Sequence, residues 1–282
     1  MSKYFGRTVL VTGASSGIGQ SIALLLMKKG YRVFGSTRYL DQLEDTQRYR
    51  SDPSSGGSIE MIDLDVCDDD SVERALSHIL GKESSIGILI NSAGLGIAGS
   101  VENTTVEEAK LQMETNFFGM HRMIRNILPI MRKNQNGLII NIGSVMGFLS
   151  IPFQAMYCAS KYAIEALTES LRMEVAPFGI HASLVEPGDT RTGFTESRLY
   201  TRASKIDAGP YYQSFTRSIR KMEQDEINGV PPEDVARIVY KIMQRRNPPI
   251  RKVVGSQYKM VYYLKRVLPS HLTEKVIRRL YT

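Results

Sequence analysis

A tyrosine and a lysine four residues apart form the pair in this chain whose chemistry is easiest to interpret. Tyr157 and Lys161 lie within residues 154–178, which hold good helix formers and no Pro or Gly before Pro177. Because residues four apart share one helix face, the phenol and the ammonium should point into the same space. A nearby cation favours the phenolate and lowers a phenol pKa from its usual value of about 10. The pair therefore predicts a general acid or base near neutral pH, although the spacing alone also occurs among surface residues.

A glycine-rich turn near the N-terminus predicts a site for a dinucleotide. The β-branched run 8–12 indicates a buried strand, residues 20–29 have a helical pattern, and Gly-Ala-Ser-Ser-Gly-Ile-Gly joins them. Glycines let the backbone approach a pyrophosphate, and a helix N-terminus supplies free N–H groups. The spacing differs from the commoner dinucleotide fingerprint, so a turn without a ligand is the alternative. The expected cofactor-binding residues here are Gly13, Ser15, Ser16, Gly17, Ile18 and Gly19.

The end of the second predicted strand, 31–37, favours NADP(H) over NAD(H). An Asp or Glu at this point would bind the free 2′-hydroxyl of the ribose in NAD(H). The sequence instead continues with Arg38, and the nearest acid is Asp41. A guanidinium suits a 2′-phosphate, whereas an exposed loop arginine is the simpler alternative.

Further strand-like runs bring small and polar residues to one edge of a sheet. Runs at 58–64, 86–90, 138–142 and 181–186 alternate with helical stretches, and 251–254 could add another strand. This alternation predicts an α/β fold, with residues 1–282 forming a single Rossmann-type domain whose parallel, doubly wound sheet of about seven strands has helices on both faces. Ligands bind beyond the carboxyl ends of such strands. The residues expected there are Asp65, Val66, Asn91, Ala93, Gly94, Ser144, Pro187 and Gly188; Asp65 would accept from an adenine amino group or cap a helix.

One asparagine interrupts a long stretch that otherwise predicts a helix. Residues 105–131 have a helical pattern and contain Asn116. Asn is a poor former of helix interiors and often disrupts them. This unfavourable effect on the helix suggests that Asn116 has a functional role, although a single Asn is weak evidence.

Taken in order, these motifs resemble the classical short-chain dehydrogenase/reductase family. Residues 12–19 are similar to its cofactor motif, and 91–94 to its Asn-Asn-Ala-Gly, with Ser92 at the second position. The resemblance identifies Asn116, Ser144, Tyr157 and Lys161 with the catalytic four, and Pro187, Gly188, Thr190 and Thr192 with the nicotinamide-side loop. The sequence around residues 157–194 is most similar to the hydroxysteroid and retinol dehydrogenase branch.

The resemblance implies hydride transfer between a nicotinamide and a carbonyl or alcohol carbon. Tyr157 would donate a proton to the carbonyl oxygen, and Ser144 would hold that oxygen. Lys161 would lower the tyrosine pKa and bind the nicotinamide ribose, as part of the cofactor site with Tyr157. Asn116 would hold a water that links Lys161 to solvent.

The segment that follows this match predicts a lid over the substrate. Residues 190–230 carry scattered aromatic side chains without a clear period, and 149–153 add an apolar stretch before Tyr157. The lid would cover a bulky hydrophobic alcohol or ketone, such as a steroid, a retinoid or a lipid. Alternatively the aromatic residues only pack the lid onto the body. The expected substrate-contacting residues are Ser144, Met146, Phe153, Tyr157 and Phe194.

Positive charge is concentrated in the C-terminal part of the chain. The net charge is +7, and residues 231–282 hold 12 Lys/Arg against 3 Asp/Glu. Residues 257–268 and 273–280 predict two amphipathic helices in a basic extension over 256–282. Such helices lie on an anionic membrane surface or, more commonly, pack their apolar stripe on their own domain. No base-reading motif accompanies the charge, so we expect no nucleic-acid partner, and we expect no metal.

The remaining features indicate a cytoplasmic protein, peripheral to a membrane if the extension binds one. The N-terminus is short and polar before the first strand, and no apolar run approaches the ~20 residues of a spanning helix. Cys67 and Cys158 suit a reducing compartment. The family resemblance implies a homodimer or homotetramer, with 105–131 and 154–178 forming the dimer interface.

Two other functions remain alternatives. The first is a dinucleotide-binding sensor or scaffold without turnover. Loss of Ser144, Tyr157 or Lys161 would have favoured it, but all three residues are present. The second is an epimerase or dehydratase on a related fold, which would carry more chain after the sixth strand.

Overall fold

A mostly parallel sheet of eight strands forms the centre of the molecule, in the order β10-β8-β7-β5-β1-β2-β4-β3. The computed structural model describes residues 4–205 and 209–282. Only β3 runs antiparallel to its neighbour, β4. The predicted Rossmann-type α/β fold is confirmed. The strands are β1 (Thr8–Val11), β2 (Arg32–Thr37), β3 (Tyr49–Asp52), β4 (Gly57–Asp63), β5 (Ile88–Asn91), β7 (Gly137–Ile142), β8 (Ile180–Glu186) and β10 (Arg251–Val253).

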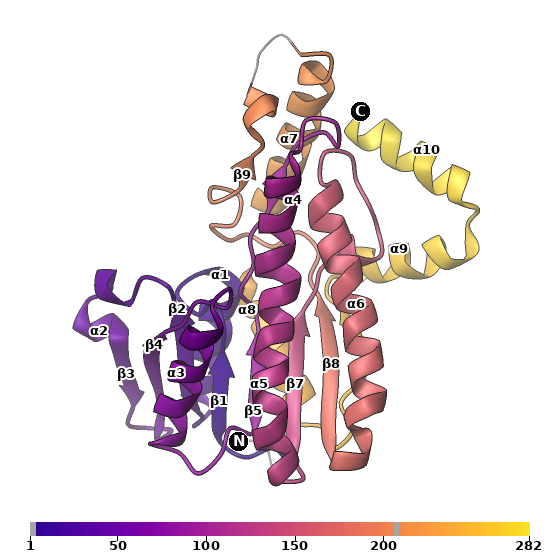
Figure 1. Ribbon diagram of the computed structural model, residues 1–282. Coiled ribbons are helices and arrows are strands. Elements are labelled where there is room, and N and C mark those ends of the chain that lie inside the picture. The colour runs from indigo at the N-terminus through magenta and orange to yellow at the C-terminus, as the bar shows by residue number, and fades with distance from the viewer. Residues whose placement is uncertain (1–3, 206–208) are drawn as a thin grey trace.

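Helices cover both faces of this sheet, as Figure 1 shows. Helices α1 (Gly17–Lys28) and α8 (Pro232–Met243) pack on one face, and α3 (Asp69–Leu80), α5 (Gly119–Lys133) and α6 (Ala155–Val175) pack on the other. Side chains alternate along a strand, so Val9 and Val11 of β1 enter the first core and Leu10 enters the second. Because both faces are buried, the strands are continuous apolar runs.

The long helix predicted over 105–131 is divided by a wider turn at Asn116. Helix α4 (Val106–Met113) is followed by the π-helical turn η2 (Glu114–Phe118) and then by α5. The Asn116 amide bonds backbone groups of Leu95 and the Ser160 hydroxyl. These bonds compensate for the irregular turn. The prediction that Asn116 disrupts the helix is confirmed.

The polar stretch 51–58 is largely a β-hairpin. Ser51 and Asp52 belong to β3, and Gly57 and Ser58 belong to β4. Only 53–56 form the turn, where Asp52 accepts hydrogen bonds from Ser54 and Gly56 adopts a φ of +68°. Residue types that commonly form turns thus also fill the two strand ends at this sheet edge.

Strand β9 (Leu199–Tyr200) and helix α7 (Tyr212–Ile227) lie beyond one end of the sheet, drawn in orange in Figure 1. Strands β6 (Ile97–Ala98) and β9 (Leu199–Tyr200) form a small second sheet, and α7 (Tyr212–Ile227) follows. The C-terminal extension forms α9 (Ser256–Val267) and α10 (Ser270–Tyr281), in yellow. The short helical turns are η1 (Leu40–Gln42), α2 (Asp45–Arg48), η3 (Val145–Gly147), η4 (Ala176–Phe178) and η5 (Arg202–Lys205).

Part of the C-terminal extension packs on its own domain. Tyr258, Val261 and Tyr262 of α9 join a cluster around Phe148, and Ile277 of α10 joins another with residues of α7. None of the helices formed by residues 4–205 and 209–282 is long and apolar enough to cross a membrane.

Candidate active site

A cavity of about 550 Å³ opens at the carboxyl ends of the central strands. Its lining includes residues that directly follow β1, β2, β4, β5, β7 and β8. The strand order reverses at β1, which has β5 on one side and β2 on the other. Open α/β sheets bind ligands at such a crevice. The expected residues that line it are Gly13, Ser15, Ser16, Gly17, Ile18, Gly19, Arg38, Asp65, Val66, Ala93, Gly94, Asn116, Ser144, Met146, Tyr157, Lys161, Pro187, Gly188, Thr190, Thr192 and Phe194.

The glycine-rich turn brings several backbone segments together at one end of this cavity. Gly13 has a φ of +65°, and a Cβ there would lie 2.9 Å from the Cα of Ala93. A Cβ on Gly19 would lie 2.2 Å from the Gly13 carbonyl oxygen. No side chain caps α1, which begins at Gly17, so its first N–H groups remain available to a ligand. Only glycine permits this backbone arrangement.

At the end of β2 the cavity is lined by hydroxyl groups and a cation. The Ser36 hydroxyl accepts from the Gly13 N–H at 3.1 Å. The exposed Arg38 places its guanidinium 5.5 Å from the centre of the Tyr39 ring. Asp65 lines the cavity at the end of β4 and accepts from the Cys67 N–H at 2.9 Å. Its other carboxylate oxygen is not used in that turn.

Asn91 does not line the cavity, although it was expected at the cofactor. It is buried below the cavity, where its amide donates to Asn141 at 2.9 Å. The neighbouring turn is instead fixed by Thr12, whose hydroxyl accepts from the N–H groups of Ser92 and Ala93 at 2.9 and 3.0 Å. Asn91 therefore supports the floor of the site and lies outside its lining.

Ser144, Tyr157 and Lys161 meet where η3 and α6 approach each other. Tyr157 and Ser144 line the same cavity, and the Ser144 hydroxyl accepts from the Met146 N–H at 3.1 Å. The Lys161 ammonium donates to the Ile142 carbonyl at 3.1 Å. Behind them, Ser160 joins Asn116 to α6, because it accepts from the Asn116 amide at 3.1 Å.

Burial, rather than Lys161, dominates the acidity of the tyrosine. Burial raises the pKa of Tyr157 above its ordinary value, and the hydrogen bond from Ser144 offsets this only in part. Burial also lowers the pKa of Lys161 to about 8. The expected lowering of the Tyr157 pKa is thus wrong for the free protein, since desolvating a phenolate outweighs the nearby cation. At neutral pH Tyr157 is a neutral proton donor.

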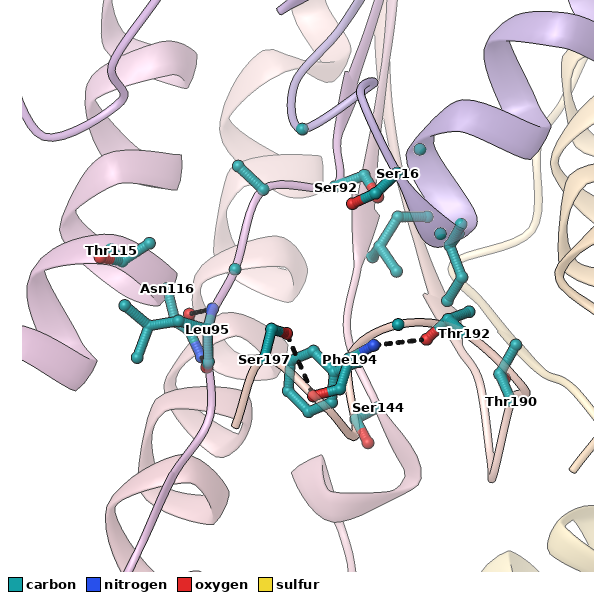
Figure 2. A pocket seen from close by; sticks show the side chains of 18 of the residues that line it. Ser16, Ser92, Leu95, Thr115, Asn116, Ser144, Thr190, Thr192, Phe194 and Ser197 are labelled. Atoms are coloured by element: carbon teal, nitrogen blue, oxygen red, sulfur yellow. Dashed lines mark hydrogen bonds between the residues drawn. The ribbon is translucent and has the colours of Figure 1, made fainter. Parts of the chain in front are cut away.

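Phe194 covers the tyrosine from the lid side. The two ring centres are 5.9 Å apart, and a Cβ on Gly96 would lie 2.8 Å from the Phe194 ring. Figure 2 shows Phe194 near Ser144, with its N–H bonded to the Thr192 hydroxyl at 3.2 Å. Phe194 therefore closes over the reactive side chains.

Phe153 does not line the cavity. It has a φ of +63°, and its ring packs edge-on against Phe215 and Tyr211 of the lid. For this residue the alternative holds, in which an aromatic side chain packs the lid onto the body.

Several lining residues escaped the sequence analysis. Gln154 precedes α6, Arg198 precedes β9, and Glu226 lies at the end of α7. Their sequence separations match no motif, and only the folded lid brings Arg198 and Glu226 into contact. Other such residues are Tyr39, Leu95, Asp189, Ser197 and Met222. Within the described ranges, no group of His, Cys, Asp and Glu could hold a metal ion.

Comparison with known proteins points to one family. The sequence model of the short chain dehydrogenase family matches residues 7–203. The chain is 38% identical over 275 residues to a 3-ketodihydrosphingosine reductase of Bacteroides thetaiotaomicron, with 97% of each chain covered. It is 34% identical to retinol dehydrogenase 8 of Bos taurus, over 94% of this chain and 86% of that one. A short chain dehydrogenase/reductase of Burkholderia phymatum, solved with NAD, has a TM-score of 0.79 at 25% identity, over 94% of both chains.

Proposed function

This chain belongs to the short-chain dehydrogenase family, and we propose that it uses NADP(H) to interconvert a bulky hydrophobic ketone and its secondary alcohol. Oxidoreductase activity with a nicotinamide dinucleotide follows from the family and its structural neighbours. The observation that carries the proposal is the convergence of Ser144, Tyr157 and Lys161 on one cavity.

The residues of the turn fit a dinucleotide. A Cβ at Gly13 or Gly19 would collide with backbone atoms, and the uncapped start of α1 offers N–H groups to a pyrophosphate. A Cβ on Gly17 would lie 3.4 Å from Thr192, so the turn and the loop after β8 form two sides of one cradle. We propose that these backbone segments hold the cofactor.

The lining at the end of β2 supports NADP(H). Arg38 is the charged residue next to Ser36 and Thr37, and no carboxylate follows β2 in the cavity lining. A guanidinium can bind a 2′-phosphate with two hydrogen bonds. The exposure of Arg38 leaves its donors available for that contact.

In the reducing direction, the Tyr157 hydroxyl would give its proton to the carbonyl oxygen while hydride reaches the carbonyl carbon. When bound, the nicotinamide supplies that hydride. The raised pKa of Tyr157 keeps the phenol protonated at neutral pH, which suits a donor. Ser144, which lines the cavity with Tyr157, would hold the same oxygen and stabilise its developing charge. The products are the alcohol, the oxidised nicotinamide and a tyrosinate, which takes up a proton from solvent.

Lys161 and Asn116 would support this transfer from behind. With a pKa of about 8, the Lys161 amine is mostly an ammonium at pH 7, able to hold ribose hydroxyl groups. Both N–H groups of the Asn116 side chain are used, by Leu95 and Ser160. For the proposed water between Lys161 and solvent, this side chain therefore offers only the second lone pair of its oxygen.

A hydrophobic substrate is supported by the apolar side chains near Tyr157. Leu95, Met146, Phe194, Leu199 and Met222 line the cavity. The names of two relatives also refer to apolar molecules, 3-ketodihydrosphingosine and retinol. Oxidation of NADPH in the presence of a panel of apolar ketones tests the proposal. Cofactor binding without turnover of any ketone or alcohol would favour the sensor alternative.

We also propose two contacts outside the cavity. Exposed apolar side chains on the helices of the expected interface, such as Leu111, Phe118 and Met173, support a homodimer or homotetramer. On the extension, Met260, Val267 and Val276 are exposed, next to basic residues, which supports contact with an anionic membrane surface. Two free cysteines support a cytoplasmic location.

A further inference from the structure

The lid carries a buried arginine whose hydrogen-bonding capacity is only partly used. The Arg198 side chain is 2% exposed, and one end of its guanidinium pairs with Glu226. Its Nε and Nη1 groups are buried and have no hydrogen-bond partner within residues 4–205 and 209–282. Buried guanidinium donors are nearly always satisfied. Within residues 4–205 and 209–282, these two Arg198 donors therefore have no acceptor in hydrogen-bonding geometry.

Arg198 lies on the substrate side of the cavity. It lines the cavity together with Glu226, and its guanidinium carbon is 5.9 Å from the centre of the Phe194 ring. The Phe194 ring is in turn 5.9 Å from the Tyr157 ring. The guanidinium carbon thus lies no farther than twice that distance from the centre of the Tyr157 ring, within the length of one small molecule.

A second unsatisfied donor faces the same cavity. The Gln154 side chain belongs to a residue that is 4% exposed, and its Nε2 group is buried without a partner in the described part of the chain. Met146, Leu199 and Met222 supply apolar lining. The substrate half of the cavity therefore combines apolar walls with donors that lack acceptors.

The charge of the Arg198–Glu226 pair selects the kind of acceptor. Glu226 neutralises Arg198, and its other oxygen accepts from the Thr195 hydroxyl at 2.6 Å. An anionic substrate group would add an uncompensated buried charge to this neutral pair, which is unfavourable. A hydroxyl, ester or amide oxygen would satisfy the free donors without that cost.

Resting on the proposed function, we propose that Arg198 determines specificity. It would bind a second, neutral oxygen of the substrate, separated from the reacting carbonyl by an apolar stretch. The substrate class is then a hydrophobic ketone or alcohol with a further hydroxyl or carbonyl group, rather than a plain hydrocarbon ketone or a keto acid. Gln154 would supply an additional donor to such a molecule.

The test compares straight-chain methyl ketones of equal length that are plain, carry a hydroxyl or ester group farther along the chain, or end in a carboxylate. With NADPH, kcat/KM is measured; with NADP⁺, which cannot reduce a ketone, the rise in melting temperature reports binding. The wild type should favour a neutral oxygen-bearing ketone over the plain one by about tenfold or more. In Arg198→Met that ratio should fall to near unity, while kcat/KM for the plain ketone should change little. Arg191→Met, at an exposed arginine of the same segment, should behave like the wild type.

Two further variants keep the test decisive. Glu226→Gln should shift preference toward the carboxylate-bearing ketone, because Arg198 then has an unpaired charge. If Arg198→Met does not fold, the double variant Arg198→Met/Glu226→Gln avoids an unpaired buried carboxylate and should show the same loss of preference.

Three results would overturn the inference. The first is an equal kcat/KM of the wild type for all the ketones, and the second is an equal fall in kcat/KM for plain and oxygen-bearing ketones in Arg198→Met. The third is weakened NADPH binding in that variant. Reduction of no ketone, together with an Arg198-dependent binding preference, would reject the proposed reaction and leave the polar subsite standing.

Discussion

The Lys161 ammonium lies 5.6 Å from the centre of the Tyr157 ring and donates to the backbone carbonyl of Ile142. The two side chains share a helix face, as their spacing predicts, yet each responds mainly to its own burial. Burial keeps the phenol protonated and makes the ammonium easier to deprotonate. In the free protein the lysine is therefore the first of the two groups to lose its proton as pH rises.

The alkaline limit of reduction should follow Lys161. The ammonium is present below its pKa of about 8 and is lost above it, whereas Tyr157 stays protonated well beyond that point. We expect kcat/KM for ketone reduction to be level up to about pH 8 and then to fall. Lys161→Met should be slower by on the order of 100-fold and show no step at that pH. A step that persists in the variant would assign it to another group.

A carboxyl cluster around the buried Glu186 should make stability depend on pH. Arg251 is shared by Glu165, Glu169 and Glu186, at 3.2, 2.7 and 3.7 Å. One cation cannot balance three carboxylates, and burial beside Glu165 raises the pKa of Glu186 to about 8.

The sign of this dependence follows from proton binding. Between the ordinary carboxyl pKa and about 8, folded Glu186 holds a proton that the unfolded chain has released. The stability contributed by this group is therefore full at acidic pH and is lost as pH rises toward 8. In Glu186→Gln, the free energy of unfolding measured with urea should fall less between pH 5 and pH 8. Parallel curves for the two proteins would contradict the assignment.

Arg38 should decide cofactor preference. Titration of NADPH and NADH, followed by nicotinamide fluorescence, should show tight NADPH binding and weak NADH binding. Arg38→Ala should raise the Kd for NADPH by roughly 10-fold or more, since a charge-assisted contact is lost. The Kd for NADH should not change. Equal affinity of the wild type for both cofactors would disprove the preference. Loss of both cofactors in the variant would point to a damaged site.

The exposed apolar side chains of the C-terminal extension should be responsible for any membrane binding. Val267 and Val276 are 77% and 58% exposed, and Lys259, Lys275 and Arg279 have no ion-pair partner within the ranges that the structure covers. Val267→Asp/Val276→Asp should abolish sedimentation with vesicles containing phosphatidylserine, because acidic groups oppose both insertion and charge attraction. Val101→Asp, at a 65% exposed position outside both the extension and the expected dimer interface, serves as the control. Equal pelleting of the two variants would show that Val267 and Val276 are not part of a membrane-binding surface.

Much of the fold follows from the sequence, because buried parallel strands such as β1 and β7 are continuous apolar runs that end at small or polar residues. The same rule placed Ser144 and Gly188 at the cavity. The antiparallel β3 was missed because an edge strand of Tyr49–Asp52 has no apolar face to reveal it.

The lid was harder to predict because its contacts join residues that are distant in the chain. Arg198 meets Glu226, and Phe153 meets Phe215, only after α7 has folded over the body. Neither pair has a spacing that a helix or strand would impose. Asn91 was misplaced for a different reason, since its side chain is buried and donates to Asn141, its partner on the neighbouring strand β7.

The central claim is that Tyr157 donates the proton in carbonyl reduction. Phe keeps the ring that packs under Phe194 and removes only the hydroxyl. The most direct measurement is kcat for NADPH-dependent reduction of an apolar ketone by wild type and Tyr157→Phe, with the Kd for NADPH determined on the same preparations. We expect kcat to fall by about two to four orders of magnitude while the Kd changes by less than about twofold. Turnover close to that of the wild type would contradict the account.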